Sequence, residues 1–543
     1  TSAGHQPYFE KNYNSILIFN GEIYNFEDLR LNLIKNGLAF QTKSDTEVLY
    51  KMFSQNEGKN SLKDLNGMFS FIYFNYEKKK IYVARDRFGV KPLYYFEKPN
   101  QFIFFASEIK QFLKLNDFKK NLDKSIINDF FKYDMVESEN EKTIFKEIKK
   151  VEPGSLIEFD ISKKNNISTS KEFYYNLSFD RQKKKIHYQE DFKNLFNKSV
   201  KIRIPKEVNY ASCLSGGIDS TLVSLIANKF SDGGISTLNF KSDLKEFDET
   251  EYYNEVISKN KFRNNYRANV KTNDVINDFS KIVFTHDQPF SNGSVLAEYY
   301  LYKEARKNNF KVVLDGHGAD ESFLGYEIDL INYYKKILKK NNIKISNIGK
   351  FNFGLRYVLR ILKQVKSRIS NINSINLDYI NPKLEKDLKI IDLNKYILFL
   401  LYKNFAKQLT SVDRNSMAFG IENRSPFLDV NLINFISNCP PGSLFKDLDK
   451  KIIIKNSYRT YIPEKILKRK KKIGYSSEEK AWNDKNMENF YIEKLKYGKK
   501  NINLELYEEL YKNFNLYKDN KSEIFKFVAF SEWHRLFCSD NTI

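Results

Sequence analysis

VNYASCLSGGIDST, residues 208–221, is the stretch that decides the fold of the larger part of this chain. An apolar strand is expected over Val208–Leu214, followed by a glycine loop, Ser215–Ser220, and a helix over Thr221–Phe230. Glycines let backbone N–H groups approach phosphate oxygens closely, and the start of the following helix adds a positive dipole. The loop lacks the Gly-Lys-Ser/Thr ending of the Walker loop and the dinucleotide glycine pattern. It therefore predicts a phosphate-binding loop of another type, with an ordinary tight turn as the alternative.

A second glycine loop, DGHGADE at residues 315–321, has the same placement after an expected strand at Val312–Leu314. Open α/β sheets bind ligands at the C-terminal ends of their parallel strands, where two such loops would lie. Asp219 in the first loop and Asp320 in the second add carboxylates, which are the ligands that Mg²⁺ prefers. A tight turn explains one such loop but explains two poorly.

Strands and helices alternate over much of residues 191–543. Further helices are expected over 191–202, 249–259 and 294–308, and a second strand over 235–240. This alternation is typical of a doubly wound α/β fold with a parallel sheet. The stretch 327–407 and the last third of the chain have helical patterns and are expected to be additions to that sheet.

Residues 1–160 have a different pattern, in which short strands are joined by tight loops. Strands over 69–74 and 81–84 form one expected hairpin, strands over 93–96 and 102–106 form another, and a helix is expected over 26–36. Such hairpins predict an α+β domain built on an antiparallel sandwich. Residues 161–190 turn polar and lose periodicity, so we expect an inter-domain linker there.

The composition narrows the class of protein. The 543 residues carry a formal net charge of +22, which raises the alternative of a basic nucleic-acid-binding protein with a relic enzyme fold. High Lys, Asn, Ile, Phe and Tyr together are instead typical of an AT-rich genome, and the lysines form no single dense patch. Cys213, Cys439 and Cys538 lack metal spacing, which favours a reduced, cytoplasmic setting. No apolar stretch reaches the length of about 18 residues that spans a bilayer.

Two later segments are rich in charge. Residues 413–429 place Asp413, Arg414 and other charged residues among apolar ones, and taken alone this segment predicts a helix end with salt bridges. The run Arg469–Lys472 is unremarkable as a solvated surface. Near a pyrophosphate, however, its cations would offset the negative charge that develops in a transition state.

Taken in this order, the two loops and the two charged segments resemble those of the glutamine-hydrolysing asparagine synthetase family. The N-terminal part resembles that family's class II glutamine amidotransferase domain, in which the nucleophile is N-terminal. The matching segments there are 20–25, 44–47, 65–69, 84–95 and 105–110. The resemblance implies an N-terminal nucleophile sandwich over 1–160, followed by an ATP-pyrophosphatase domain over 191–543.

The resemblance also implies two sites. In the glutamine site, Asn20 and Gly21 match the oxyanion hole, and Glu22 and Asp45 match the groups that hold the substrate's α-amino group. The residues matched to the ATP site are Leu214 and Leu238 at the adenine, Ser215, Gly216, Gly217, Ile218, Asp219 and Ser220 at the pyrophosphate, Asp315 and Gly316 at the nucleotide through their backbone, Asp219 and Asp320 at Mg²⁺, and Lys471 at the adenylation transition state.

The reaction implied by the family has two halves. Glutamine is hydrolysed at the first site, and the ammonia passes through an internal tunnel to the second. There a carboxylate, aspartate in the asparagine-forming branch, attacks ATP to give an acyl-adenylate, and ammonia displaces AMP. ATP and Mg²⁺ are the expected cofactors and the partners are small molecules. A homodimer is possible, and neither nucleic acid nor a membrane is expected.

Two departures from the family stand out. The family's N-terminal Cys nucleophile, whose α-amino group is the base, would lie about 50 residues before Thr1. We therefore expect that the N-terminal segment is missing from this sequence, and that the chain as it stands uses ammonia but not glutamine.

The second departure is His317, where the asparagine-forming branch usually has Glu. A neutral imidazole is suited to act as a base, but His317 could also serve only in packing. This leaves another carboxylate, such as a sugar acid, as the alternative acceptor.

Overall fold

The computed structural model describes most of the chain. The described residues are 4–10, 14–55, 59–99, 101–134, 136, 141–163, 166–179, 187–241, 248–325, 397–398, 400–446, 449–469, 485–502 and 521–539. Lys471 and most of the helical region expected over 327–407 lie outside this set, so those two predictions remain predictions. Within the described ranges, no helix is long and apolar enough to cross a membrane.

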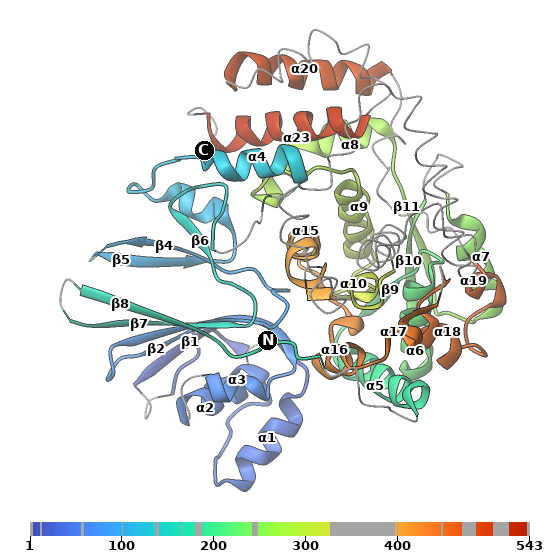
Figure 1. The fold of residues 1–543 in the computed structure, drawn as a ribbon, viewed down its shortest axis with the longest axis horizontal. Helices are drawn as coiled ribbons and strands as arrows, with labels where there is room; N and C mark the ends of the chain where they lie inside the picture. The colour runs from blue at the N-terminus through green and yellow to red at the C-terminus, as the bar shows by residue number, and fades with distance from the viewer. Residues whose placement is uncertain are drawn as a thin grey trace, which may run out of the picture.

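The N-terminal part is a sandwich of two antiparallel sheets, as the hairpin pattern predicted. The first sheet contains, in spatial order, β1 (Ser15–Ile23), β2 (Gly67–Asn75), β3 (Lys80–Arg85), β7 (Ser155–Lys163) and β8 (Asn166–Phe173). The second contains β5 (Phe102–Ala106), β4 (Tyr94–Lys98) and β6 (Ile148–Lys150). Val83, Tyr95, Ile157 and Phe159 form a buried cluster between the sheets. Helices α1 (Phe26–Lys35) and α2 (Asp45–Gln55) lie below the first sheet in Figure 1.

Strand β8 lies inside the segment 161–190, so the linker prediction is wrong for residues 166–173. The strand pairs antiparallel with β7, from Ser155 opposite Phe173 to Lys163 opposite Asn166. Its sequence, NISTSKEF, lacks an apolar alternation because it is an edge strand with mostly exposed side chains. Backbone hydrogen bonds hold such a strand, and a hydrophobic pattern cannot reveal it.

The C-terminal part contains the predicted parallel sheet. Its strands, in spatial order, are β11 (Asn265–Asn269), β10 (Ser236–Lys241), β9 (Tyr210–Cys213), β12 (Val312–Leu314) and β13 (Glu422–Arg424). All four pairings are parallel. The chain builds outward from β9 in one direction and then returns to its other side with β12. The order of strands therefore reverses between β9 and β12, which is where open α/β sheets bind ligands.

Helices surround this sheet. The helices used below are α5 (Tyr188–Arg203), α6 (Ile218–Phe230), α7 (Thr250–Lys259), α8 (Thr272–His286), α9 (Ser294–Lys307), α10 (Ala319–Phe323), α15 (Ala406–Met417) and α18 (Ile452–Ser457). The ends of the four whose bounds were predicted, α5, α6, α7 and α9, agree with the prediction within three residues. Helix α6 begins at Ile218, three residues earlier than predicted, with Gly217 as its N-cap. Asp219 is therefore in the first turn of the helix, where the helix dipole favours a negative charge.

The C-terminal helix α23 (Lys521–Phe537) joins the two parts of the molecule. It packs against α4 (Lys124–Tyr133) of the N-terminal part, where the rings of Phe130 and Phe530 stack with centroids 5.7 Å apart. The indole Nε1 of Trp533 donates a hydrogen bond to the carbonyl oxygen of Asp287, at 2.8 Å, just after α8. Figure 1 shows α4, α8 and α23 together at the top of the molecule. The last helix thus contributes to a core shared by both parts.

Candidate active site

The two predicted glycine loops meet at the switch point of the parallel sheet. A Cβ on Gly316 would lie 3.0 Å from the Cβ of Asp219 and from the backbone nitrogen of Ser220, so the second loop packs directly on the first. Gly216 has φ +80°, and a Cβ there would come within 2.6 Å of the Tyr253 nitrogen at the start of α7. Gly216 therefore needs glycine, and a side chain at Gly316 would require the first loop to shift by a few tenths of an ångström.

Serine hydroxyls hold the first loop in shape. The Ser215 and Ser220 hydroxyls are 3.0 Å apart, and Ser220 Oγ also accepts from the Ser215 backbone nitrogen at 3.2 Å. The Gly217 backbone nitrogen donates to Ser215 Oγ at 3.2 Å. The loop is therefore closed by its own side chains at the start of α6. A phosphate group could take over these hydroxyl and N–H donors.

Asp219 and Asp320, the two residues predicted to hold Mg²⁺, both contact one lysine. That lysine is Lys451, whose Nζ lies 2.5 Å from Asp219 Oδ2 and 2.6 Å from Asp320 Oδ1. The Lys451 side chain is only 5% exposed. Two carboxylates facing a shared positive charge are a donor set that fits Mg²⁺ together with phosphate oxygens. Sequence reasoning missed Lys451, because one lysine among 90 Lys and Arg residues carries no local signal.

His317 lies between two carboxylates. Its Nδ1 contacts Asp315 Oδ2, and its Nε2 is 3.4 Å from Glu298 Oε1. Burial by itself would lower the pKa of His317, but the charges of Asp315 and Glu298 outweigh burial and raise that pKa to about 9. The side chain is therefore a cation at neutral pH. This argues against the hypothesis of a neutral imidazole base and leaves a role for His317 as a fixed positive charge.

Asp315 is held by the neighbouring strand as well as by His317. Its carboxylate accepts from Asn423 Nδ2 and from Ser425 Oγ, each at 2.7 Å. Its backbone nitrogen donates to the Arg424 carbonyl oxygen at 3.1 Å. These contacts fix the second loop against β13, a short polar strand that the sequence pattern did not predict. The expected backbone contact between Asp315 and the nucleotide remains a prediction.

A cavity of about 710 Å³ opens along both loops. Its walls include Ser215, Asp219, Asp320, His317 and Glu298. Residues of α4 and α15 close it from the other side, so both parts of the molecule contribute to its walls. A volume of this size holds a nucleotide together with a small acceptor.

Of the two leucines expected at the adenine, Leu238 lies in β10 and Leu214 directly follows β9. Leu214 donates its backbone N–H to the Leu238 carbonyl oxygen at 2.8 Å, and the two side chains are 0% and 1% exposed. Neither leucine belongs to the set of described residues that line the cavity. Their contact with adenine remains a prediction.

The residues predicted for the glutamine site also lie together. Gly21 pairs with Phe69 across β1 and β2, and a Cβ on it would be 2.1 Å from the Met68 carbonyl oxygen. Asp45, at the start of α2, accepts from the Ile23 backbone nitrogen at 3.0 Å. Burial raises the pKa of Glu22 to about 8, with Asp45 and Glu422 adding to the rise and Arg424 opposing it. A substrate ammonium would be favoured beside these crowded carboxylates.

Strand β13 connects the two sites. Side chains on a strand alternate between its two faces. Arg424 Nη2 is 3.3 Å from Glu22 Oε2 in the predicted glutamine site, whereas the preceding Asn423 bonds Asp315 in the second glycine loop. Neither contact was visible in the sequence, because each joins residues more than a hundred positions apart.

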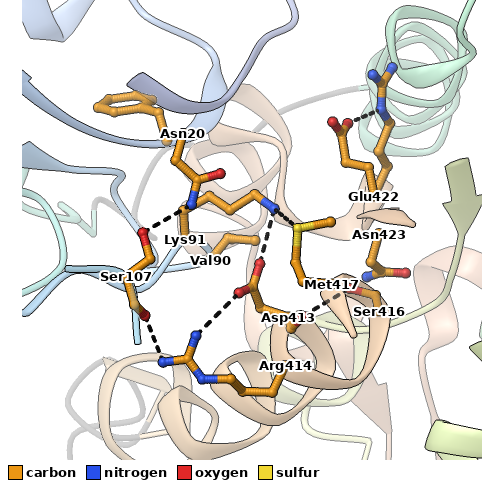
Figure 2. A network of polar contacts seen from close by, with 12 residues as sticks. Asn20, Val90, Lys91, Ser107, Asp413, Arg414, Ser416, Met417, Glu422 and Asn423 are labelled. Atoms are coloured by element: carbon orange, nitrogen blue, oxygen red, sulfur yellow. Dashed lines mark hydrogen bonds and ion pairs between the residues drawn. The ribbon is translucent and has the colours of Figure 1, made fainter. Parts of the chain in front are cut away.

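Figure 2 shows a second connection between the two parts. Asn20 Nδ2 donates to Ser107 Oγ at 3.4 Å, and the Ser107 carbonyl oxygen accepts from Arg414 Nη2 of α15 at 2.7 Å. Beside them, Lys91 Nζ bonds Asp413 Oδ1 at 2.9 Å. The predicted oxyanion-hole residue Asn20 is therefore linked to α15, whose residues also line the cavity beside the two glycine loops.

An antiparallel sandwich with a crowded carboxylate site, joined to a parallel sheet with two glycine loops, is the architecture that the resemblance predicted for an ATP-dependent amidotransferase. The family model for the glutamine amidotransferase domain matches residues 1–175, and the model for asparagine synthase matches residues 191–535. The chain belongs to the asparagine synthase family.

The chain resembles three glutamine-hydrolyzing asparagine synthetases of Bacillus subtilis. It is 28% identical to asparagine synthetase 1, over 98% of this chain and 87% of that protein. It is 27% identical to asparagine synthetase 2, over 83% of this chain and 61% of that protein. It is also 27% identical to asparagine synthetase 3, over 84% of this chain and 74% of that protein. The likeness thus extends over both parts of the chain at moderate identity.

Proposed function

We propose that the chain uses ATP to convert a carboxylate into an amide, with aspartate as the acceptor and glutamine or ammonia as the nitrogen donor. The convergence of Asp219 and Asp320 on one cation, beside a closed serine and glycine loop, carries this proposal. Mg²⁺ held there would neutralise phosphate charge and orient the leaving pyrophosphate. None of the three cysteines forms a disulfide, which supports the cytoplasm as the compartment.

The residues of this chain have separable roles in that reaction. The loop Ser215–Ser220 holds the pyrophosphate as the acceptor carboxylate attacks the α-phosphorus, and Lys451 adds positive charge where the leaving group becomes more negative. Lys471 has the same expected role from the segment outside the described residues. The acyl-adenylate then remains in a cavity walled by both parts of the molecule, and this protects it from water.

A second acceptor class is favoured by one observation. His317 stands as a cation between Asp315 and Glu298, where the asparagine-forming branch has a single acid. A changed charge pattern in the acceptor cavity suits a carboxylate other than aspartate, such as a sugar acid. The glutamine-dependent half of the reaction is common to both candidates.

The two candidates are separated by ATP–pyrophosphate exchange with a panel of carboxylates. We expect aspartate to stimulate exchange in the presence of Mg²⁺, with asparagine and AMP formed when ammonia is added. Stimulation by a sugar acid and not by aspartate would replace the first candidate with the second. Absence of exchange with every carboxylate, including sugar acids, would refute adenylation itself.

A further inference from the structure

Helix α9 places a carboxylate in the wall of the ATP cavity, opposite the second loop. The Glu298 side chain is 16% exposed, and it lines the cavity. Oε1 faces the imidazole Nε2 of His317 at 3.4 Å, and Oε2 accepts from Asn415 Nδ2 at 3.1 Å. Glu298 is therefore oriented from two sides, by the loop and by α15, with its carboxylate facing the space where the reaction would occur.

Asn415 is itself fixed by buried neighbours. Its Nδ2 also donates to the Val295 carbonyl oxygen at 3.0 Å, and its Oδ1 lies 2.9 Å from His286 Nε2. Because an amide oxygen can only accept, His286 Nε2 must be the donor. Burial lowers the pKa of His286 to about 3, so this imidazole stays neutral and keeps that single tautomer. The chain of contacts from His286 to Glu298 thus has one consistent set of donors and acceptors.

The second half of an amidation needs a base. When ammonia adds to the acyl carbon, the nitrogen carries a positive charge until it loses a proton. His317 is protonated and cannot accept that proton. Asp219 and Asp320 are bonded to Lys451, and Asp315 accepts from Asn423, Ser425 and His317.

We propose that Glu298 is a catalytic base of amide formation, oriented by Asn415 and by the neighbouring His317. The inference rests on the proposed function. In the step, the ammonia nitrogen forms a bond to the acyl carbon, and the Glu298 carboxylate takes one proton from that nitrogen. The bond from the acyl carbon to the AMP oxygen then breaks, and AMP leaves with the electron pair. Glu298 afterwards releases its proton to solvent.

The acid–base behaviour of Glu298 agrees with this role. Burial is the largest effect on the pKa of Glu298 and raises it to about 7. The negative charge of Asp315 also raises this pKa, whereas the positive charge of His317 and the hydrogen bond from Asn415 oppose the rise. Among the described residues, the charged groups facing Glu298 are His317 and Asp315 from the second loop, and the titratable Cys213 and Tyr302 also interact with it. A base with a pKa near the working pH combines adequate basicity with a large unprotonated fraction. Above about pH 7 the carboxylate form predominates, and the base is then active.

The test compares Glu298→Gln with Glu304→Gln. Glu304 is on the same helix and bonds Asn308 at its C-terminal end, away from the cavity walls. Each full-length variant is assayed for ATP–pyrophosphate exchange with the acceptor and, separately, for amide formation with added ammonia. Glu298→Gln is expected to keep exchange within about threefold of wild type and to lose amide formation by about 100-fold or more. Glu304→Gln is expected to behave as wild type in both assays.

The pH profile gives an independent readout. At a constant concentration of uncharged ammonia, wild-type amide formation is expected to rise with pH through about 7, and Glu298→Gln is expected to lack that rise. Two results would overturn the role of Glu298. One is a Glu298→Gln variant that forms amide at the wild-type rate, and the other is a variant that loses exchange and amide formation to the same extent. Absence of exchange in the wild-type protein with any carboxylate would instead refute the proposed function, so the two failures are distinguishable.

Discussion

Replacement of Lys451 by Met is expected to reduce amide formation by about 100-fold or more and to lower the free energy of unfolding by about 3–5 kcal/mol. The ammonium group bonds both Asp219 and Asp320, and its loss leaves two buried carboxylates facing each other without their shared cation. The same change removes positive charge from the place where pyrophosphate would leave. Thermal unfolding and AMP release, measured on the same preparation, report the two effects.

Lys455→Met is the matched control for this variant. Lys451 is the N-cap of α18 and Lys455 lies within that helix, but Lys455 pairs with Asp449, whose side chain is 56% exposed. Exposed pairs contribute only about 0–1 kcal/mol, so stability and turnover should both stay near wild type. If Lys451→Met retained wild-type stability and wild-type AMP release, Lys451 would have neither role.

Replacement of Lys91 by Met is expected to cost about 3–5 kcal/mol of stability, because it removes the closer of two cations from the buried Asp413 carboxylate and leaves only Arg414 Nη1, at 3.9 Å. The two side chains are 3% and 5% exposed, and they join the N-terminal part to α15, as Figure 2 shows. Urea unfolding monitored by tryptophan fluorescence provides the measurement. The nearest comparison is Lys80→Met, which breaks a more exposed pair with Glu158.

A double variant tests the cause of that loss. Lys91→Met combined with Asp413→Leu removes both charges, so no carboxylate is left buried at this position without its lysine partner. We expect the double variant to be more stable than Lys91→Met alone. A double variant that is as unstable as the sum of the two single variants would show that the packing of these residues matters and their charge pairing does not.

Local sequence was sufficient to predict where the two loops lie in the fold but not their surroundings. Ser215–Ser220 and Asp315–Glu321 follow strands and precede helices, and that order is visible within a dozen residues. Lys451 reaches Asp219 across 232 positions, and its contact depends on the packing of α18 against the loops. The sequence around Glu298 predicts only a helix. Its place in the cavity depends on the packing of α9 beside the second loop, which brings it to 3.4 Å from His317.

The glutamine site shows the same limit. Asn20, Glu22 and Asp45 could be assigned because they lie in short motifs that match the family. The contact between Glu22 and Arg424 could not, because Arg424 comes from the far end of the parallel sheet. Strand β8 was missed for a different reason: an exposed edge strand needs no apolar face, so hydrophobic periodicity does not mark it.

The central claim is that the two loops form an acyl-adenylate, and oxygen-18 transfer tests it most directly. The acceptor, labelled in both carboxylate oxygens, is incubated with ATP, Mg²⁺ and ammonia, and the products are analysed by mass spectrometry. If the carboxylate attacks the α-phosphorus, one labelled oxygen appears in AMP and pyrophosphate is unlabelled. Label in inorganic phosphate, accompanied by ADP, would contradict the account, because it would mean attack on the terminal phosphorus.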